Sequence, residues 1–100
     1  MQDEFDEKRR QSELKLIKKM EPFLKDYEDD ELLSILSKTV GMYQQSNNEN
    51  FYFTALGTFL FLMQIRDPDK DTQATAQNLY FDLCKVAQKY QKDGSKPLQN

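Results

Sequence analysis

Few side chains in this sequence could carry out chemistry. Among those that could, the acidic residues form the densest cluster along the chain. Five of the six residues in the run DYEDDE, positions 26–31, are acidic. Such a run could bind a cation or a basic partner. It could also start a helix, with Asp29 or Asp30 as the N-cap and Glu31 favoured by the helix dipole. The spacing lacks the central glycine and distal glutamate of a calcium loop, so we predict that the run caps a helix.

Nucleophiles and metal ligands are scarce. The sequence contains no histidine and one cysteine, Cys84. Without histidine, a cysteine or serine has no imidazole to activate it, and one thiol cannot build a zinc or iron–sulfur site. Neither a GxGxxG nor a GxxxxGK[ST] phosphate loop occurs. We therefore predict that Cys84 is a small packed thiol and that the chain is not an enzyme and uses no cofactor or metal.

Lysines form the most regular charged pattern. Lys85, Lys89, Lys92 and Lys96 follow one another at spacings of four, three and four. These spacings place the first three along one stripe of a helix. The stripe could be a solvated face, or it could contact an acidic partner or an anionic membrane surface. We take these four lysines as the candidate partner-binding residues.

Composition narrows the class of protein. With 100 residues and 38% hydrophobic residues, the chain suits a single domain with one modest core. Its 17 acids and 14 bases give a net charge of −3, whereas a nucleic-acid binder is usually basic. The polar start MQDEFDEKRR shows no secretory signal, and the single thiol suits a reducing compartment. We therefore predict a cytoplasmic protein that does not bind nucleic acid.

The elements that must position these side chains are predicted to be helices. Apolar residues recur at three- and four-residue spacing, and only 3 glycines and 3 prolines occur. We expect helices over residues 3–26, 30–45, 51–65 and 72–92, with a kink or break in the first caused by Pro22. Short connections favour an antiparallel up-down four-helix bundle over residues 1–94, followed by a flexible tail at 95–100.

The third expected helix, FYFTALGTFLFLMQI, is apolar nearly all round. It is shorter than the roughly 20 residues that cross a bilayer. We predict instead that it is the most enclosed helix, and that Gly57 allows a neighbouring helix to approach closely. The aromatic residues outnumber what one face of each helix can bury. They could all fill the core, or some of them, such as Tyr52, Phe61 or Phe81, could lie on the outer face as a partner patch.

The order of these features resembles that of the small cytosolic immunity proteins that protect bacteria from pediocin-like (class IIa) bacteriocins, above all the enterocin A immunity branch. The resemblance covers roughly residues 24–90. It consists of an acidic entry into ELLSILSKTV, a polar linker, the hydrophobic helix ALGTFLFLM, a short hydrophilic turn and AQNLYFDLCKVAQKY. One departure is charge, because many members of that family are basic and this chain is acidic.

The resemblance implies a four-helix bundle that does no chemistry. Such proteins recognise the mannose phosphotransferase permease from the cytosolic side once the bacteriocin has engaged it, and so block the lethal pore. The last helix and tail govern which bacteriocin is resisted, which directs attention to the exposed side of the last helix and to residues 93–100. The alternative is a general helical interaction module, such as an adaptor, a secretion chaperone or a phage-type regulator. Peripheral association with a membrane is also possible in either case.

Overall fold

The computed structural model describes the backbone of residues 2–94 and the side chains of residues 6–91. Four α-helices follow one another: α1 (Gln2–Leu24), α2 (Asp29–Ser46), α3 (Glu49–Phe61) and α4 (Lys70–Gly94), with a π-helical turn, η1 (Leu62–Arg66), continuing α3. The predicted all-α four-helix fold is confirmed. The predicted tail, residues 95–100, lies outside the described residues. None of the described helices combines the length and the apolar character needed to cross a membrane.

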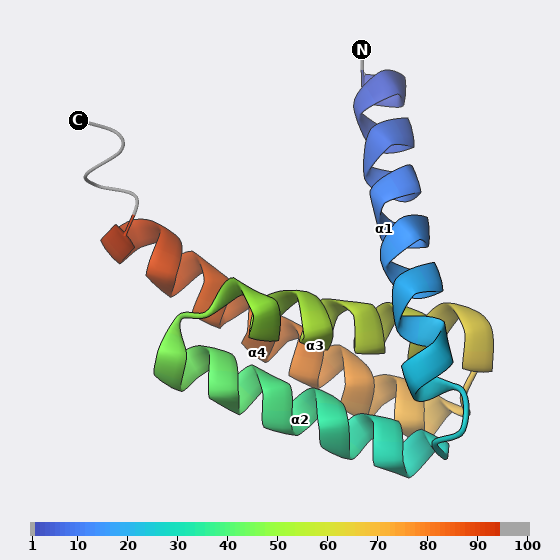
Figure 1. The fold of residues 1–100 in the computed structure, drawn as a ribbon. Coiled ribbons are helices and arrows are strands. Elements are labelled where there is room, and N and C mark those ends of the chain that lie inside the picture. The colour runs from blue at the N-terminus through green and yellow to red at the C-terminus, as the bar shows by residue number, and fades with distance from the viewer. Residues whose placement is uncertain (1, 95–100) are drawn as a thin grey trace.

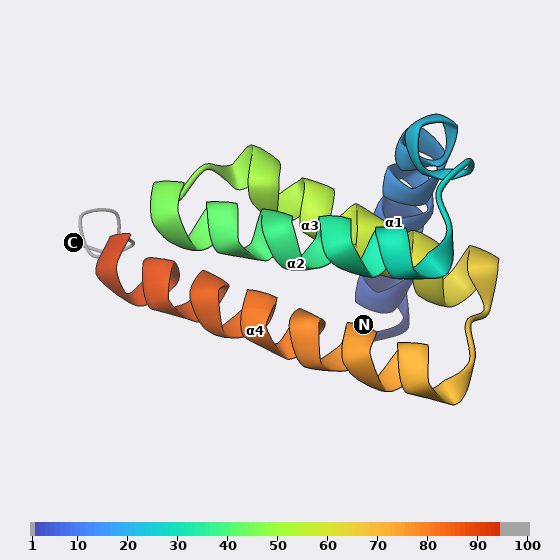
Figure 2. The same ribbon diagram turned by 90° about the horizontal axis from the view of Figure 1, so that it is seen from below.

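Three of the helices alternate in direction around a shared core. α2 and α3 run antiparallel, and α4 returns beside both of them (Figure 1, Figure 2). α3 is the central element, because it contacts α1, α2 and α4. This confirms the prediction that the hydrophobic helix is the most enclosed. The largest of the side chains that are less than 2% exposed and fill the core are Leu32, Leu36, Thr58, Phe61, Leu62 and Leu83.

α1 stands across the other three helices instead of lying along them (Figure 1). Its contacts are made chiefly with α3. The cause can be read from its sequence, because the apolar residues that pack, such as Leu16, Ile17, Met20 and Leu24, all belong to its second half. A helix must carry an apolar stripe along its whole length to lie in a bundle groove. The first half of α1 therefore projects beyond α3.

Gly57 is the point at which α1 comes closest to α3. A Cβ atom added there would lie 2.6 Å from Met20 Cγ and 3.2 Å from Leu16 Cγ, which is closer than side chains pack. The predicted close approach of a neighbouring helix is therefore confirmed, and α1 is that neighbour. Pro22 does not divide α1, which continues to Leu24. Because Pro22 lies in the last turn, its missing N–H removes only one bond near the end of the helix.

Local capping residues define the remaining helix ends, and the start of α4 differs from the prediction. Asn47 adopts a left-handed conformation (φ 58°) and ends α2. Asn48 then caps α3, its side-chain oxygen accepting a hydrogen bond from the backbone N–H two residues later at 2.9 Å. α4 begins earlier than expected, because Asp69 Oδ1 accepts from the Thr72 N–H at 2.9 Å. Asp69 thus caps α4, which begins at Lys70 instead of at the predicted position 72.

Candidate interaction surface

A groove of about 410 Å³ opens where α1 crosses α3 beside α4. We call it the α1–α3 groove. Its apolar and aromatic lining consists of Leu16, Tyr52, Phe53, Leu56 and Tyr80. Four of these side chains are half-buried, and Phe53 is 48% exposed. The polar lining comes from α1 and consists of Arg9, Ser12, Glu13, Lys15 and Lys19.

The charge of this groove is opposite to that of the whole chain. Three cations and one carboxylate line it, whereas the chain carries a net charge of −3. Arg9 Nε lies 3.5 Å from Glu13 Oε2, so those two charges partly offset each other. No ion pair within the described part of the chain involves Lys15 or Lys19. These two exposed ammonium groups therefore give the groove a positive edge.

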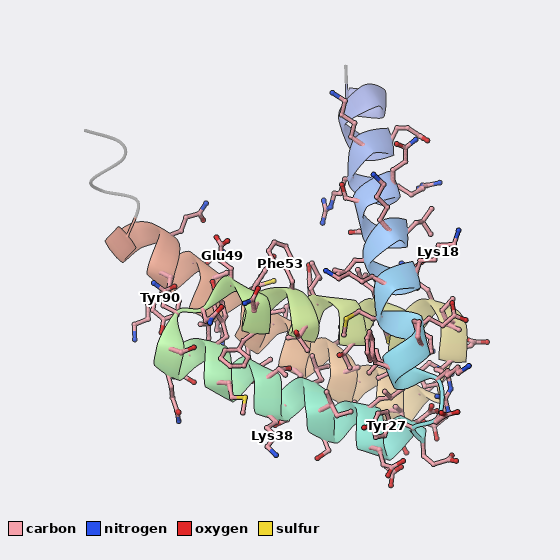
Figure 3. All side chains as sticks on the ribbon, in the orientation of Figure 1. Lys18, Tyr27, Lys38, Glu49, Phe53 and Tyr90 are labelled. Atoms are coloured by element: carbon pink, nitrogen blue, oxygen red, sulfur yellow. The ribbon has the colours of Figure 1, made fainter. Side chains whose placement is uncertain are left out.

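Labelled side chains in Figure 3 show which side of α1 faces the groove. Phe53 rises from α3 into the corner between α3 and α1, while Lys18 projects from the opposite side of α1 (Figure 3). Lys18 is also absent from the lining. Consecutive positions on a helix point about 100° apart, so neighbouring lysines can face different surroundings. Lys18 is thus a basic residue of the same helix that lies outside the groove.

Tyrosines supply the polar groups inside the groove. Burial is the main cause that raises the pKa of Tyr52 and of Tyr80. A hydrogen bond with the Cys84 thiol raises the pKa of Tyr80 further. Both phenols are therefore neutral at physiological pH and can donate a hydrogen bond. Tyr80 is also stacked on Phe59, with ring centroids 4.5 Å apart. Cys84 itself is half-buried within α4.

A second hollow, of about 380 Å³, adjoins the first at Tyr52 and Phe53. Tyr43 lines it, with ring centroids 5.5 Å from Tyr52 and 5.3 Å from Tyr90. The Tyr90 hydroxyl donates to the backbone carbonyl of Gln44, which ties α4 to the end of α2. Tyr52 and Phe53 therefore separate two hollows, and the aromatic surface continues from one into the other.

The predicted lysine stripe is only partly described. Lys85 and Lys89 are both exposed on α4. Lys85 lines a hollow of about 440 Å³ between α4 and α2, together with Asp82. The side chain of Lys92 and the whole of Lys96 lie outside the described residues. Contact of these lysines with a partner stays a prediction.

The aromatic residues are distributed differently from the prediction. Phe81 is 59% exposed, as expected for a surface aromatic, and Tyr52 is half-buried. Phe61, one of the three candidates for the outer face, is 1% exposed and belongs to the core. Phe53 was missed. The sequence of α3 contains almost no polar face, so it could not show which side of the helix turns outward.

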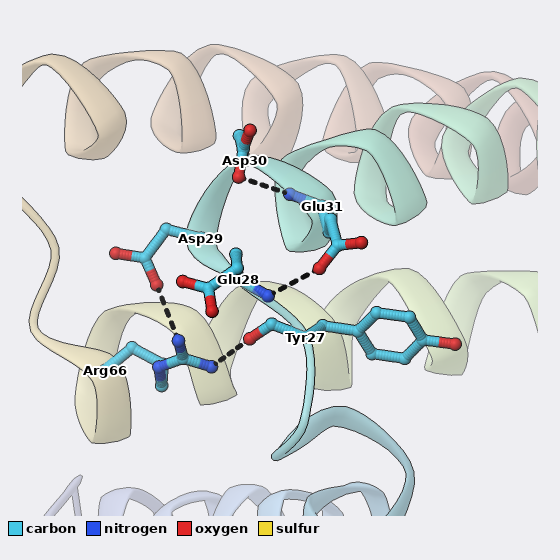
Figure 4. Close-up of polar contacts among 6 residues, drawn as sticks. All are labelled: Tyr27, Glu28, Asp29, Asp30, Glu31 and Arg66. Carbon is cyan, nitrogen blue, oxygen red and sulfur yellow. Dashed lines mark hydrogen bonds and ion pairs between the residues drawn. The ribbon is translucent and has the colours of Figure 1, made fainter.

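The acidic run forms the start of α2 and a link to η1 (Figure 4). The N-cap is Glu28, not Asp29 or Asp30 as predicted. Its N–H donates to Glu31 Oε1 at 2.8 Å, while Asp29 Oδ1 lies 3.3 Å from Arg66 Nη2. Glu28 takes the cap because its extended backbone (φ −79°, ψ 166°) precedes the first helical residue.

Arg66, which pairs with Asp29, also makes a second contact. Its Nη1 donates to the Tyr27 carbonyl oxygen at 2.6 Å, so one guanidinium joins the α1–α2 connection to the end of η1. Glu28, Asp29 and Glu31 are thus engaged in capping and pairing. Across residues 6–91, no cluster of three or more potential metal ligands occurs. The prediction that the run caps a helix is therefore confirmed.

Comparison with known proteins provides no relative. No protein-family model matches the chain, and no match is found among curated proteins or solved structures. The function is therefore inferred from the residues of the chain and from their geometry.

Proposed function

We propose that this protein is a non-catalytic immunity protein of the pediocin-like type. It acts in the cytoplasm by binding the mannose phosphotransferase permease once a bacteriocin has engaged it. The observation that carries the proposal is the order of sequence features over residues 24–90. These features fall on an acidic start of α2, a hydrophobic α3 and an amphipathic α4. A central α3 enclosed by the other helices supports the same reading.

The surfaces of the molecule suit binding better than chemistry. The side chains that line the α1–α3 groove include three aromatic residues and Arg9, and aromatic residues and arginine are enriched in protein interfaces. The exposed lysines of α4, Lys85 and Lys89, with Lys92 and Lys96 after them, are proposed as further contacts with the permease or with the membrane surface beside it.

Survival of a sensitive strain tests the proposal directly. The chain is expressed in a bacteriocin-sensitive Gram-positive strain, which is then exposed to a panel of pediocin-like bacteriocins. We expect protection against one or a few members of the panel. Lys85→Glu with Lys89→Glu should reduce protection, whereas Lys38→Glu, on the exposed side of α2, should not. An abundant, folded protein that protects against no bacteriocin of the panel would refute the proposal.

The α1–α3 groove favours a second candidate function, that of a general helical interaction module. An adaptor or chaperone of this kind binds a soluble partner and needs no bacteriocin. A stable complex of defined stoichiometry with one soluble protein, in a cell that gains no resistance, would select this candidate over immunity.

A further inference from the structure

The α1–α3 groove is lined only by helices, and this limits how it can recognise a partner. Every residue that lines it belongs to α1, α3 or α4. The backbone N–H and C=O groups in helix interiors are already paired, so the groove has no strand edge that could extend a sheet with a bound peptide. Recognition must therefore use side chains. The common mode of this kind is an amphipathic helix that inserts apolar residues into a groove.

The charges of the groove select the kind of helix. Lys15 and Lys19 edge the groove and are exposed, and within the described residues neither has an ion-pair partner. An acidic partner would meet these ammonium groups, whereas a basic one would be repelled by them and by Arg9. Complementary charge steers partners and excludes wrong ones even where it adds little affinity.

We propose that the α1–α3 groove binds an acidic amphipathic helix of a protein partner. The apolar side chains of that helix pack against Phe53, Leu56 and Leu16, and its carboxylates face Lys15 and Lys19. The neutral hydroxyl of Tyr52 offers a hydrogen bond inside the groove. The proposal rests on the proposed function only in taking protein binding as the role of the chain, and it names the kind of segment that is bound.

The aromatic edge of the groove suits this occupant. Phe53 is 48% exposed, although a large apolar side chain gains free energy when it is removed from water. Its ring stands edge-on to Tyr52, with centroids 5.3 Å apart, so it is already held in place by a neighbour. A pre-positioned aromatic loses little side-chain entropy on binding and is the usual anchor of an interface.

A displayed peptide library tests the proposal while the partner itself is still unidentified. Random peptides of about 20 residues, long enough to form a helix, are selected against the full immobilised chain, and the enriched peptides are synthesised with a fluorescent label. We expect apolar residues at three- and four-residue spacing together with several Asp or Glu. Anisotropy titrations should show that Phe53→Ser, and separately Lys15→Glu with Lys19→Glu, weaken binding about tenfold or more.

Two matched variants serve as controls. Lys18→Glu makes the same charge change on the other side of α1, and Phe81→Ser removes an exposed aromatic that does not line the groove. Both should bind the peptides within about twofold of the wild type. Circular dichroism and urea unfolding of each variant show whether it is folded. Because Phe53 and both lysines are exposed, their variants should retain the helical fold.

Several results would overturn the proposal. They are a selection without enrichment, enriched peptides that are basic or proline-rich, and binding that is indifferent to the Phe53 and lysine variants. If vesicles of phosphatidylglycerol, but not phosphatidylcholine, bind the chain and the same variants abolish that binding, the groove recognises a membrane instead. Success of the peptide selection in a chain that gives no bacteriocin protection would refute immunity alone. If the chain gives protection but its peptide binding is unchanged by Phe53→Ser and by Lys15→Glu with Lys19→Glu, the groove proposal alone is refuted.

Discussion

Replacing Gly57 with alanine measures how firmly α1 is held on α3. The new Cβ would lie 2.6 Å from Met20 Cγ and 3.2 Å from Leu16 Cγ, so α1 must move or its side chains must rearrange. Overpacking of this kind costs about 1–3 kcal/mol. The alanine also improves helix propensity by about 1 kcal/mol. We therefore expect Gly57→Ala to change the free energy of unfolding by between about zero and 2 kcal/mol, in the destabilising direction.

Gly41 provides the matched control for this substitution. It also lies inside a helix, and neither glycine has a positive φ. A Cβ added at Gly41 would meet no atom within 4 Å. Gly41→Ala should therefore stabilise the fold by up to about 1 kcal/mol. Because the propensity gain is common to both variants, the difference of about 1–3 kcal/mol between them reports the α1–α3 contact.

Urea unfolding followed by circular dichroism measures both variants, with the midpoint and slope fitted together. Met20→Ala supplies a further check, since it removes the atom that the new Cβ meets most closely. In that background, Gly57→Ala should cost less, with a coupling of about 0.5–3 kcal/mol between the two sites. If Gly57→Ala stabilises the fold as much as Gly41→Ala does, α1 is not packed over Gly57 and the reasoning is refuted.

The other predictions concern stability at three further places. Arg66→Lys loses the simultaneous contacts with the Tyr27 carbonyl oxygen and Asp29. Because the Arg66 side chain is 25% exposed, the substitution should lower the free energy of unfolding in urea by only about 1 kcal/mol. An unchanged free energy would show that these contacts are not maintained in solution. Hydrogen bonds from Thr72 lower the pKa of Asp69, so Asp69 stabilises the fold above its unfolded pKa and loses this effect as the pH falls through the lowered value. The drop in Tm between neutral and acidic solution should therefore be smaller in Asp69→Asn, and an equal drop would contradict this. Phe61→Ala should cost about 3–5 kcal/mol, whereas Phe81→Ser should stay within about 0.5 kcal/mol; similar costs for the two would contradict their exposed fractions of 1% and 59%.

Local signals in the sequence were enough to determine the helices. Apolar spacing and the scarcity of glycine and proline predicted four helices, and the structure has four helices at nearly the same residues. The glycine at position 57 indicated a close approach, which the structure confirms. These features could be predicted because capping and periodicity involve residues within one or two turns of each other.

The candidate groove depended on relations that no local signal contains. α3 is apolar nearly all round, so its sequence could not show that Phe61 turns inward and Phe53 outward. Arg66 reaches Tyr27 across 39 positions of sequence, and nothing near either residue indicates the other.

The sequence by itself therefore determined that this protein is built of four helices and where most of their apolar faces lie. Only the tertiary structure decided that α1 crosses α3, and thus that Lys15 and Lys19 lie beside Phe53 and Tyr52. The physical reason is that the period of a helix defines a face relative to that helix alone. Which other helix covers that face depends on the relative free energies of all the ways in which the helices can pack. Close contacts between distant parts of the chain, such as the one between α1 and Gly57, determine which arrangement is favoured.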